Sequence, residues 1–151
     1  LAVEKYLDVY KKKLPYVILR MFNVYGPGQS ADGGYAAVIP AFKKAATAGK
    51  ECTIFGDGTQ IRDFIHVHDL TRIISLALEA EELPSELNVA SGEGTSLLDL
   101  IELFSELNPE MPPPIFQEER PGDIHTSLAD TSRLTSSLQI GEMIDLKEGL
   151  S

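Results

Sequence analysis

The chain contains 151 residues, 43% of them hydrophobic and 24% charged, and carries a formal net charge of −10 at pH 7. This length suits one domain, and the composition is that of a soluble globular protein rather than a disordered or membrane-spanning one. The negative charge argues against nucleic acid as a partner, because it repels a phosphate backbone. With a single cysteine, Cys52, and no signal-peptide pattern, we expect a cytoplasmic protein that does not bind membranes.

The first ten residues predict an amphipathic helix. Val3, Tyr6, Leu7 and Tyr10 follow the spacing of one helix face. No capping residue precedes this helix, and an uncapped first turn frays. We therefore expect the chain to be a piece of a longer protein.

Strands and helices alternate in the rest of the chain. The apolar run of residues 16–19 predicts a strand that is buried on both faces, as in a parallel sheet. A polar, glycine-rich loop is expected from Asn23 to Gly34. The later elements are expected to be, in chain order, a helix at 38–46, short strands at 52–55 and 64–67, a helix capped by Asp69, a buried strand at 87–90, a helix at 97–107 with a Ser96–Asp99 capping box, and an extended segment at 115–116.

This order of elements predicts an α/β fold whose middle part is mixed, because two strand pairs are too close in sequence for a helical crossover. Ligands of open α/β sheets bind at the carboxyl ends of the strands. Asn23 comes just after the strand at 16–19, and its amide can both donate to and accept from sugar hydroxyls. Its alternative role is to support the turn at Gly26-Pro27-Gly28.

Two arginines are candidates for binding an anionic ligand in this acidic chain. Arg62 follows a Gly-Asp-Gly turn, and Arg120 lies in a turn with Pro121 and Gly122. A guanidinium presents a rigid fork of donors that matches phosphate oxygens, so two of them could bind a diphosphate. The alternative is that each forms a weak surface ion pair, Arg62 with Asp63 or Asp57 and Arg120 with Glu118 or Glu119.

His66 and His68 invite a metal-binding interpretation, since side chains two apart share one face of a strand. Further ligands are few, with only His125 and scattered carboxylates as candidates, so we favour a packed His66 and expect no metal. Cys52 has no adjacent base and is expected to be a small apolar core residue.

Four stretches, taken together, resemble the extended short-chain dehydrogenase/reductase family, and within it the NAD-dependent epimerases and dehydratases similar to UDP-glucose 4-epimerase. Any one of them would be weak evidence, but all four occur in the family's order. They are residues 1–5 (LAVEK), 19–29 (LRMFNVYGPGQ), 54–69 (IFGDGTQIRDFIHVHD) and 119–124 (ERPGDI).

The resemblance covers essentially all of residues 1–151 but only the C-terminal half of the family's chain. It implies the last parallel strands of a Rossmann-like fold plus a small mixed α/β substrate-binding lobe. The reaction implied is inversion of a sugar hydroxyl through a keto intermediate, with NAD as cofactor. The family's catalytic Tyr and Lys and its glycine-rich dinucleotide fingerprint would lie before Leu1, so no catalytic residue is expected within this chain, and the piece alone is expected to be inactive.

The resemblance also assigns ligand contacts. Phe22 corresponds to a residue whose backbone touches the nicotinamide end of NAD. For the UDP-sugar it implies Asn23 near the diphosphate, a uridine pocket with Phe55 against the base, two diphosphate arginines and an acceptor for a ribose hydroxyl. The implied substrate-binding residues are Asn23, Val38, Thr53, Phe55, Arg62, Arg120 and Asp123.

Some alternatives stay open within this interpretation. Ala37 and Ser127 stand where many family members have Asn or Tyr, so the sugar is not fixed. A nucleotide-sugar dehydratase or decarboxylase of the same family, or a non-catalytic nucleotide-sugar-binding protein, would share Asn23 and Arg62. Family members often dimerise through helices that include the one ending near Tyr10, so the intact enzyme is expected to be a homodimer.

Overall fold

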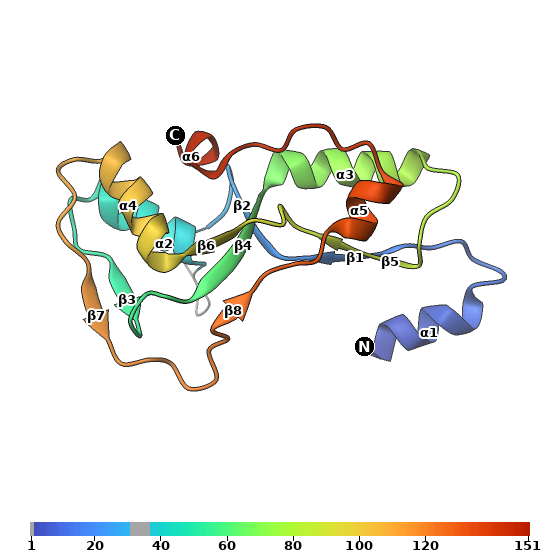
Figure 1. Cartoon of the computed structure of the whole chain (residues 1–151), viewed down its shortest axis with the longest axis horizontal. Helices are drawn as coiled ribbons and strands as arrows, with labels where there is room; N and C mark the ends of the chain where they lie inside the picture. The colour runs from blue at the N-terminus through green and yellow to red at the C-terminus, as the bar shows by residue number, and fades with distance from the viewer. Residues whose placement is uncertain (1, 31–36) are drawn as a thin grey trace.

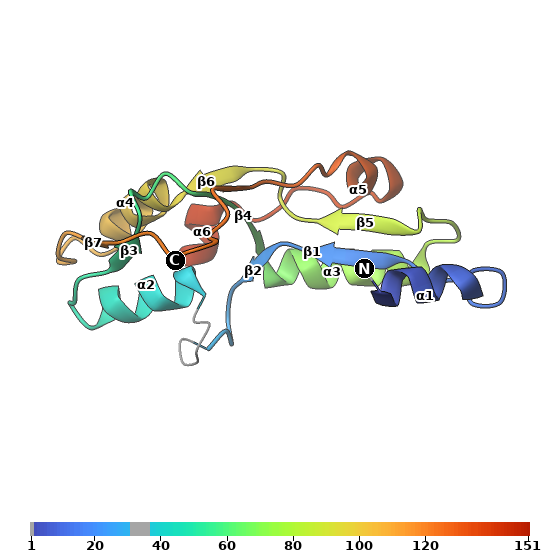
Figure 2. The same cartoon turned by 90° about the horizontal axis from the view of Figure 1, so that it is seen from below.

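The computed structural model describes residues 2–30 and 37–151, with the side chain of Ala2 left aside, and shows an elongated α/β molecule (Figures 1 and 2). The second half of the expected glycine-rich loop, including Gly33 and Gly34, lies outside the described residues. No helix of the described part is long and apolar enough to cross a membrane.

The strands form three small sheets along the length of the molecule (Figure 1). At one end β1 pairs in parallel with β5, and at the other β3 pairs in parallel with β7. In the middle β4 pairs in parallel with β2 and β8 but antiparallel with β6, which confirms the expected mixed arrangement. The strands are β1 (Ile18–Met21), β2 (Asn23–Tyr25), β3 (Thr53–Phe55), β4 (Ile61–His66), β5 (Glu86–Val89), β6 (Gly94–Ser96), β7 (Ile115–Gln117) and β8 (Thr126–Ser127).

Helices α2 to α6 contribute to two hydrophobic cores, which β4 connects, and no described residue of α1 belongs to either core. One core joins α2 and α4 to β3 and contains Ile54 and Phe104; the other joins α3 and α5 to β5 and contains Ile73 and Leu87. The helices are α1 (Ala2–Tyr10), α2 (Val38–Thr47), α3 (Val67–Glu79), α4 (Leu97–Leu107), α5 (Ser132–Ser137) and α6 (Leu146–Leu150).

The expected capping box of α4 is confirmed. The Ser96 hydroxyl accepts a hydrogen bond from the Asp99 backbone N–H at 3.0 Å, and the Asp99 carboxylate accepts from the Ser96 N–H at 3.2 Å. The expected cap of α3 was wrong, because β4 continues to His66 and α3 begins at Val67. His66 therefore caps α3, and the Asp69 carboxylate accepts instead from the backbone N–H of Ile144 at 2.9 Å.

Two strand predictions also need correction. The first strand begins at Ile18 rather than residue 16, and it is half-buried and then exposed rather than buried on both faces. Its burial is low because β5 is its one strand neighbour in the described structure and Met21 faces outward, 57% exposed. Residues 23–25 are not loop but β2, because Asn23 and its neighbours pair with residues 64–66 of β4.

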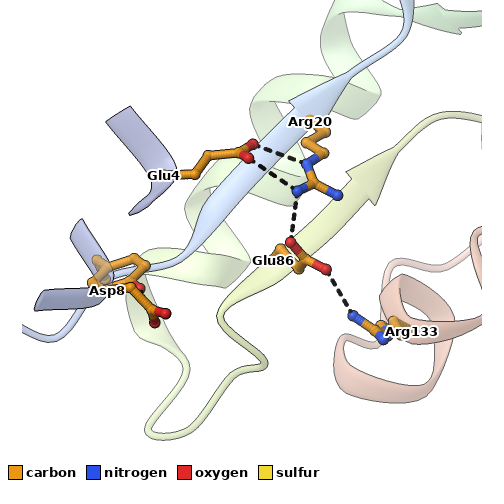
Figure 3. A network of polar contacts seen from close by, with 6 residues as sticks. Glu4, Asp8, Arg20, Glu86 and Arg133 are labelled. Atoms are coloured by element: carbon orange, nitrogen blue, oxygen red, sulfur yellow. Dashed lines mark hydrogen bonds and ion pairs between the residues drawn. The ribbon is translucent and has the colours of Figure 1, made fainter. Parts of the chain in front are cut away.

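A surface network of charged side chains ties α1 to the rest of the molecule (Figure 3). Arg20 of β1 donates to both carboxylate oxygens of Glu4, at 3.0 and 3.2 Å, and contacts Glu86 of β5 at 2.7 Å. Glu86 in turn contacts Arg133 of α5 at 3.2 Å. The network therefore links two helices across the β1–β5 sheet.

Candidate functional site

A cavity of about 270 Å³ lies where β2, β3 and β4 meet the start of α2 and the segment after β7. Of the eight ligand-contacting residues expected from the sequence, seven line this cavity. They are Asn23, Val38, Thr53, Phe55, Arg62, Arg120 and Asp123. They come from five separate parts of the chain, so the fold brings together residues up to 100 positions apart.

Arg62 points from β4 toward the segment that follows β7. Its guanidinium donates to the Asp123 carboxylate at 2.7 Å and to the backbone carbonyl of Ile124 at 2.6 Å. The expected alternative pairs with Asp63 or Asp57 were wrong. Asp63 follows Arg62 in the strand, and its carboxylate bonds to a different part of the chain, while Asp57 accepts hydrogen bonds from Thr59.

Arg120 lies over the aromatic ring of Phe55, with its guanidinium carbon 3.8 Å from the ring centroid. Among the described residues it forms no ion pair with Glu118 or Glu119, so that alternative was also wrong. A guanidinium on an aromatic face is held by the ring's negative potential while its edge donors stay available. Arg120 can therefore still donate to an anion in the cavity.

Asn23 begins β2 and donates from its side-chain amide to the backbone carbonyl of Asp63 at 2.9 Å. It does not support the turn at residues 26–28, as the alternative interpretation held. This bond uses one of its two amide N–H groups, and the side-chain carbonyl remains an acceptor. Asn23 is thereby oriented in the cavity wall beside β4.

The other walls of the cavity are apolar and aromatic. Thr53 and Phe55 stand on either side of the fully buried Ile54 in β3, and strand alternation points both toward the cavity. Val38 lies in the first turn of α2. Ala37 caps that helix without a side-chain hydrogen bond and also lines the cavity.

Gln60 is a polar wall residue that the sequence did not single out. Gln60 is 3% exposed, lines the cavity and donates from its side-chain amide to the Phe55 carbonyl. The available signal was its position two residues before Arg62, since residues two apart share a strand face. By holding the Phe55 backbone, Gln60 fixes the wall that carries the aromatic ring.

Phe22, the expected NAD contact, does not line the cavity. It lies between β1 and β2, where its backbone N–H donates to the Val89 carbonyl at 3.0 Å and its carbonyl accepts from the Val24 N–H at 3.0 Å. It thus sits beyond the end of β1, next to the site rather than within it.

The described lining residues suit binding better than proton transfer. Asp123, a carboxylate in the wall, is held by Arg62. The Tyr25 hydroxyl is buried, and burial together with the nearby Asp69, Asp145 and Glu148 raises the pKa of Tyr25 to about 12. A phenol with that pKa neither donates nor accepts a proton readily near neutral pH.

His66 is buried, as expected, whereas His68 is exposed. The His66 ring accepts a hydrogen bond from the His68 backbone N–H at 3.3 Å, and burial lowers the pKa of His66. In the described part of the chain no group of three His, Cys, Asp or Glu side chains is placed to hold a metal ion. Burial likewise raises the pKa of the Cys52 thiol to about 11, which fits a core residue.

The model of the NAD dependent epimerase/dehydratase family matches residues 1–90, which is more than half of the chain. The chain belongs to this family. An uncharacterized UDP-glucose epimerase of Bacillus subtilis is 33% identical over the whole chain and 48% of its own length. The chain thus spans about half the length of the curated relatives it matches.

Solved structures of family members share the fold. UDP-glucose 4-epimerase of Thermotoga maritima with UDP-glucose superposes with a TM-score of 0.91 at 33% identity, over 99% of this chain and 48% of that one. UDP-N-acetylglucosamine 4-epimerase of Methanobrevibacter ruminantium, in complex with UDP-N-acetylmuramic acid, gives 0.89 at 38% identity over the same shares.

Similarity within the family is not confined to epimerases. A UDP-N-acetyl-α-D-glucosaminuronate decarboxylase of Bacillus cytotoxicus is 35% identical over 62% of this chain and 29% of its own length. In fold, the chain is mixed α/β and matches the C-terminal half of these Rossmann-like proteins.

Proposed function

We propose that this chain is the substrate-binding half of an NAD-dependent nucleotide-sugar 4-epimerase of the UDP-glucose type. The observation that carries the proposal is the convergence of Arg62, Arg120, Asn23 and Phe55 on one cavity. Two guanidinium groups next to an aromatic ring and an amide suit a ligand that combines a diphosphate, a flat base and hydroxyl groups. UDP-sugars have all three.

Each wall residue has a binding role in this proposal. Arg62 and Arg120 bind the diphosphate oxygens, and Asn23 bonds the sugar end near the diphosphate. Phe55, with Thr53 and Val38, surrounds the uracil ring, and Asp123 accepts from a ribose hydroxyl. The ion pair between Arg62 and Asp123 holds both side chains at the cavity wall.

The chemical step would require groups from outside this chain. We expect a Tyr and a Lys four residues later, together with the glycine-rich NAD-binding fingerprint, upstream of Leu1 in the complete protein. This half-length match to curated relatives supports that division. NAD bound there would supply reversible hydride transfer at the sugar carbon, while residues of this chain would hold and orient the substrate.

A decarboxylase or dehydratase is the second candidate, favoured by the 35% identity to the Bacillus cytotoxicus decarboxylase. Those activities would use the same Arg62 and Asn23 for binding. They would differ in the groups at the sugar carbon, which in our proposal come from outside this chain.

The proposal includes an assembly and a compartment. The outer face of α1 exposes Val3, Tyr6 and Val9, at 72%, 68% and 79%, and we expect a second copy of the complete enzyme to cover it. The lone, buried Cys52 leads us to expect a reducing cytoplasm.

A 4-epimerase assay with UDP-glucose and NAD on two proteins tests the proposal. One is the 151-residue chain and the other is the complete natural protein that contains it. We expect product from the complete protein and none from the chain. Turnover by the chain alone would overturn the proposal. Dehydration of UDP-glucose by the complete protein, or decarboxylation of UDP-glucuronic acid offered in its place, would overturn the epimerase assignment.

A further inference from the structure

Asp63 is a carboxylate with no solvent exposure and, among the described residues, no ion-pair partner. Burying a charged group is costly unless hydrogen bonds replace its hydration. Asp63 meets this condition through its surroundings. One carboxylate oxygen accepts from the Ser91 backbone N–H at 2.9 Å and the Ser91 hydroxyl at 2.7 Å, and the other from the N–H groups of Gly92 at 3.1 Å and Ala129 at 3.2 Å.

These four bonds reach two distant parts of the chain. Ser91 and Gly92 follow β5, and Ala129 follows β8. The backbone carbonyl of Asp63 also accepts from Asn23 of β2. One residue of β4 is thus bonded to segments on either side of it in the fold, including the end of the segment that carries Asp123.

Arg62, the residue before Asp63 in β4, contacts the segment at residues 123–129 from the cavity side. Arg62 bonds to Asp123 and Ile124, and β4 pairs with β8 in the register that places Arg62 opposite Ser127. Successive side chains of a strand point to opposite faces. Arg62 and Asp63 therefore fasten residues 123–129 to both faces of one strand.

We infer that Asp63 is a positioning residue, which sets the geometry of the Arg62–Asp123 pair through its bonds to Ala129 and the loop at residues 91–92. The inference rests on the proposed function in assigning that pair to a nucleotide sugar. Asp63 itself touches no ligand, since it does not line the cavity.

The variant Asp63→Asn keeps the size and shape of the side chain but replaces one acceptor oxygen with a donor group. Its NH2 must face either Ser91 or the N–H groups of Gly92 and Ala129. Two accepted bonds become donor–donor contacts on the Gly92 side, and one on the Ser91 side, where the hydroxyl can turn to accept. Asp69→Asn is the matched control. Asp69 is 1% exposed and its carboxylate bonds to Arg72 and Ile144, outside the cavity wall.

The readout is a double-mutant cycle of Arg62→Ala and Asp123→Ala, measured by urea unfolding of the 151-residue chain. We expect the pair to be coupled by about fivefold in the unfolding constant, as neighbouring charged residues are. The coupling should disappear in the Asp63→Asn background and persist in the Asp69→Asn background. A merely structural role would lower stability in both backgrounds and leave the coupling intact.

Titration with UDP is the second arm. Asp63→Asn should weaken UDP binding by about tenfold, equivalent to the loss of one well-placed charged hydrogen bond, and Asp69→Asn by less than twofold. If Asp63→Asn does not fold, both measurements are made on Ser91→Ala, which removes one of the four hydrogen bonds. The expected losses of coupling and of UDP affinity are then smaller. Unchanged coupling in the folded Asp63 or Ser91 variant, or equal loss with Asp69→Asn, overturns the inference. Lost coupling in a chain that does not bind UDP supports the positioning role and overturns the nucleotide assignment.

Discussion

The guanidinium carbon of Arg120 lies 3.8 Å from the centroid of the Phe55 ring. The proposal assigns Arg120 to the diphosphate and Phe55 to the base of one ligand, so the two side chains that bind these parts contact each other. The contact holds the segment after β7 against β3. It also covers one face of the ring. A base that binds on Phe55 must therefore use the other face or displace Arg120, and both groups should respond to the same ligand.

Replacing Phe55 should weaken binding of the base more than binding of the phosphates. Phe55→Leu keeps an apolar side chain but removes the aromatic face, which contributes about 1–3 kcal/mol per stacked base in other proteins. We therefore expect about tenfold weaker UDP binding and a smaller loss of inorganic pyrophosphate binding, since Arg120 loses the ring that holds it, both measured by ligand-observed NMR. Equal losses for the two ligands would contradict a base-binding role.

The two cavity arginines should each contribute to UDP binding. A hydrogen bond between a charged donor and a phosphate is worth about 1.5–3 kcal/mol, so Arg62→Ala and Arg120→Ala should each weaken UDP binding by about tenfold or more. Arg133→Ala is the control for loss of one positive charge, because Arg133 pairs with Glu86 far from the cavity. If neither cavity variant differs from Arg133→Ala, the diphosphate assignment fails.

Stability should fall on acidification through the pKa of His66. Burial lowers this pKa, the nearby His68 lowers it further, and Asp69 and Glu148 oppose the shift. Because the unfolded chain binds the proton more readily, the stabilising contribution of neutral His66 is complete above pH 6.5 and is lost as pH falls toward the lower folded pKa. Protonation would also abolish acceptance of the His68 N–H by the ring.

Urea unfolding between pH 7.5 and 5 measures this effect. His66→Gln should show a flatter pH dependence than the wild-type chain over that range. His125→Gln is the control, since His125 is exposed. A wild-type slope that survives in His66→Gln would place the titrating group elsewhere.

The helix α1 should loosen when its charged tether is cut. Arg20 binds both oxygens of Glu4, and this contact lowers the pKa of Glu4. Arg20→Ala should therefore increase hydrogen exchange in residues 2–10 without affecting α3. Arg133→Ala, which removes the far end of the same network, should leave α1 protected (Figure 3).

The same contact sets a pH window for α1. A carboxyl group with a lowered pKa stabilises the folded state above its unfolded value of 4.5 and loses this contribution as pH falls through the lower folded pKa. Exchange in α1 should rise in that range in the wild-type chain but not in Arg20→Ala. High salt should have a similar effect, because the pair is exposed.

The sequence was most informative where one element had a strong local pattern. The capping box of α4 is a local feature, and the structure confirms it. Strands β6 and β8 were missed. They contain three and two residues, largely polar, and exist because β4 offers them a partner.

The candidate site was predictable in its residue types but not in its contacts. Arg62 and Arg120 stood out because an acidic chain has few placed cations, and the family resemblance supplied Phe55 and Asp123. That Arg62 would bond to Asp123 and Arg120 would lie on Phe55 depends on how the segment after β7 folds back on β3 and β4. No local sequence pattern predicts that this segment packs against β3 and β4.

Binding of a nucleotide sugar in the cavity is tested most directly by amide NMR of the ¹⁵N-labelled chain during titration with UDP-glucose. We expect weak binding, because part of the site comes from the rest of the protein, with a dissociation constant of about 1 mM. Shifts should be concentrated at Asn23, Phe55, Arg62 and residues 120–124, and α5 should be unaffected. A folded chain whose amides do not respond at millimolar UDP-glucose, or respond only outside the cavity, would contradict the account.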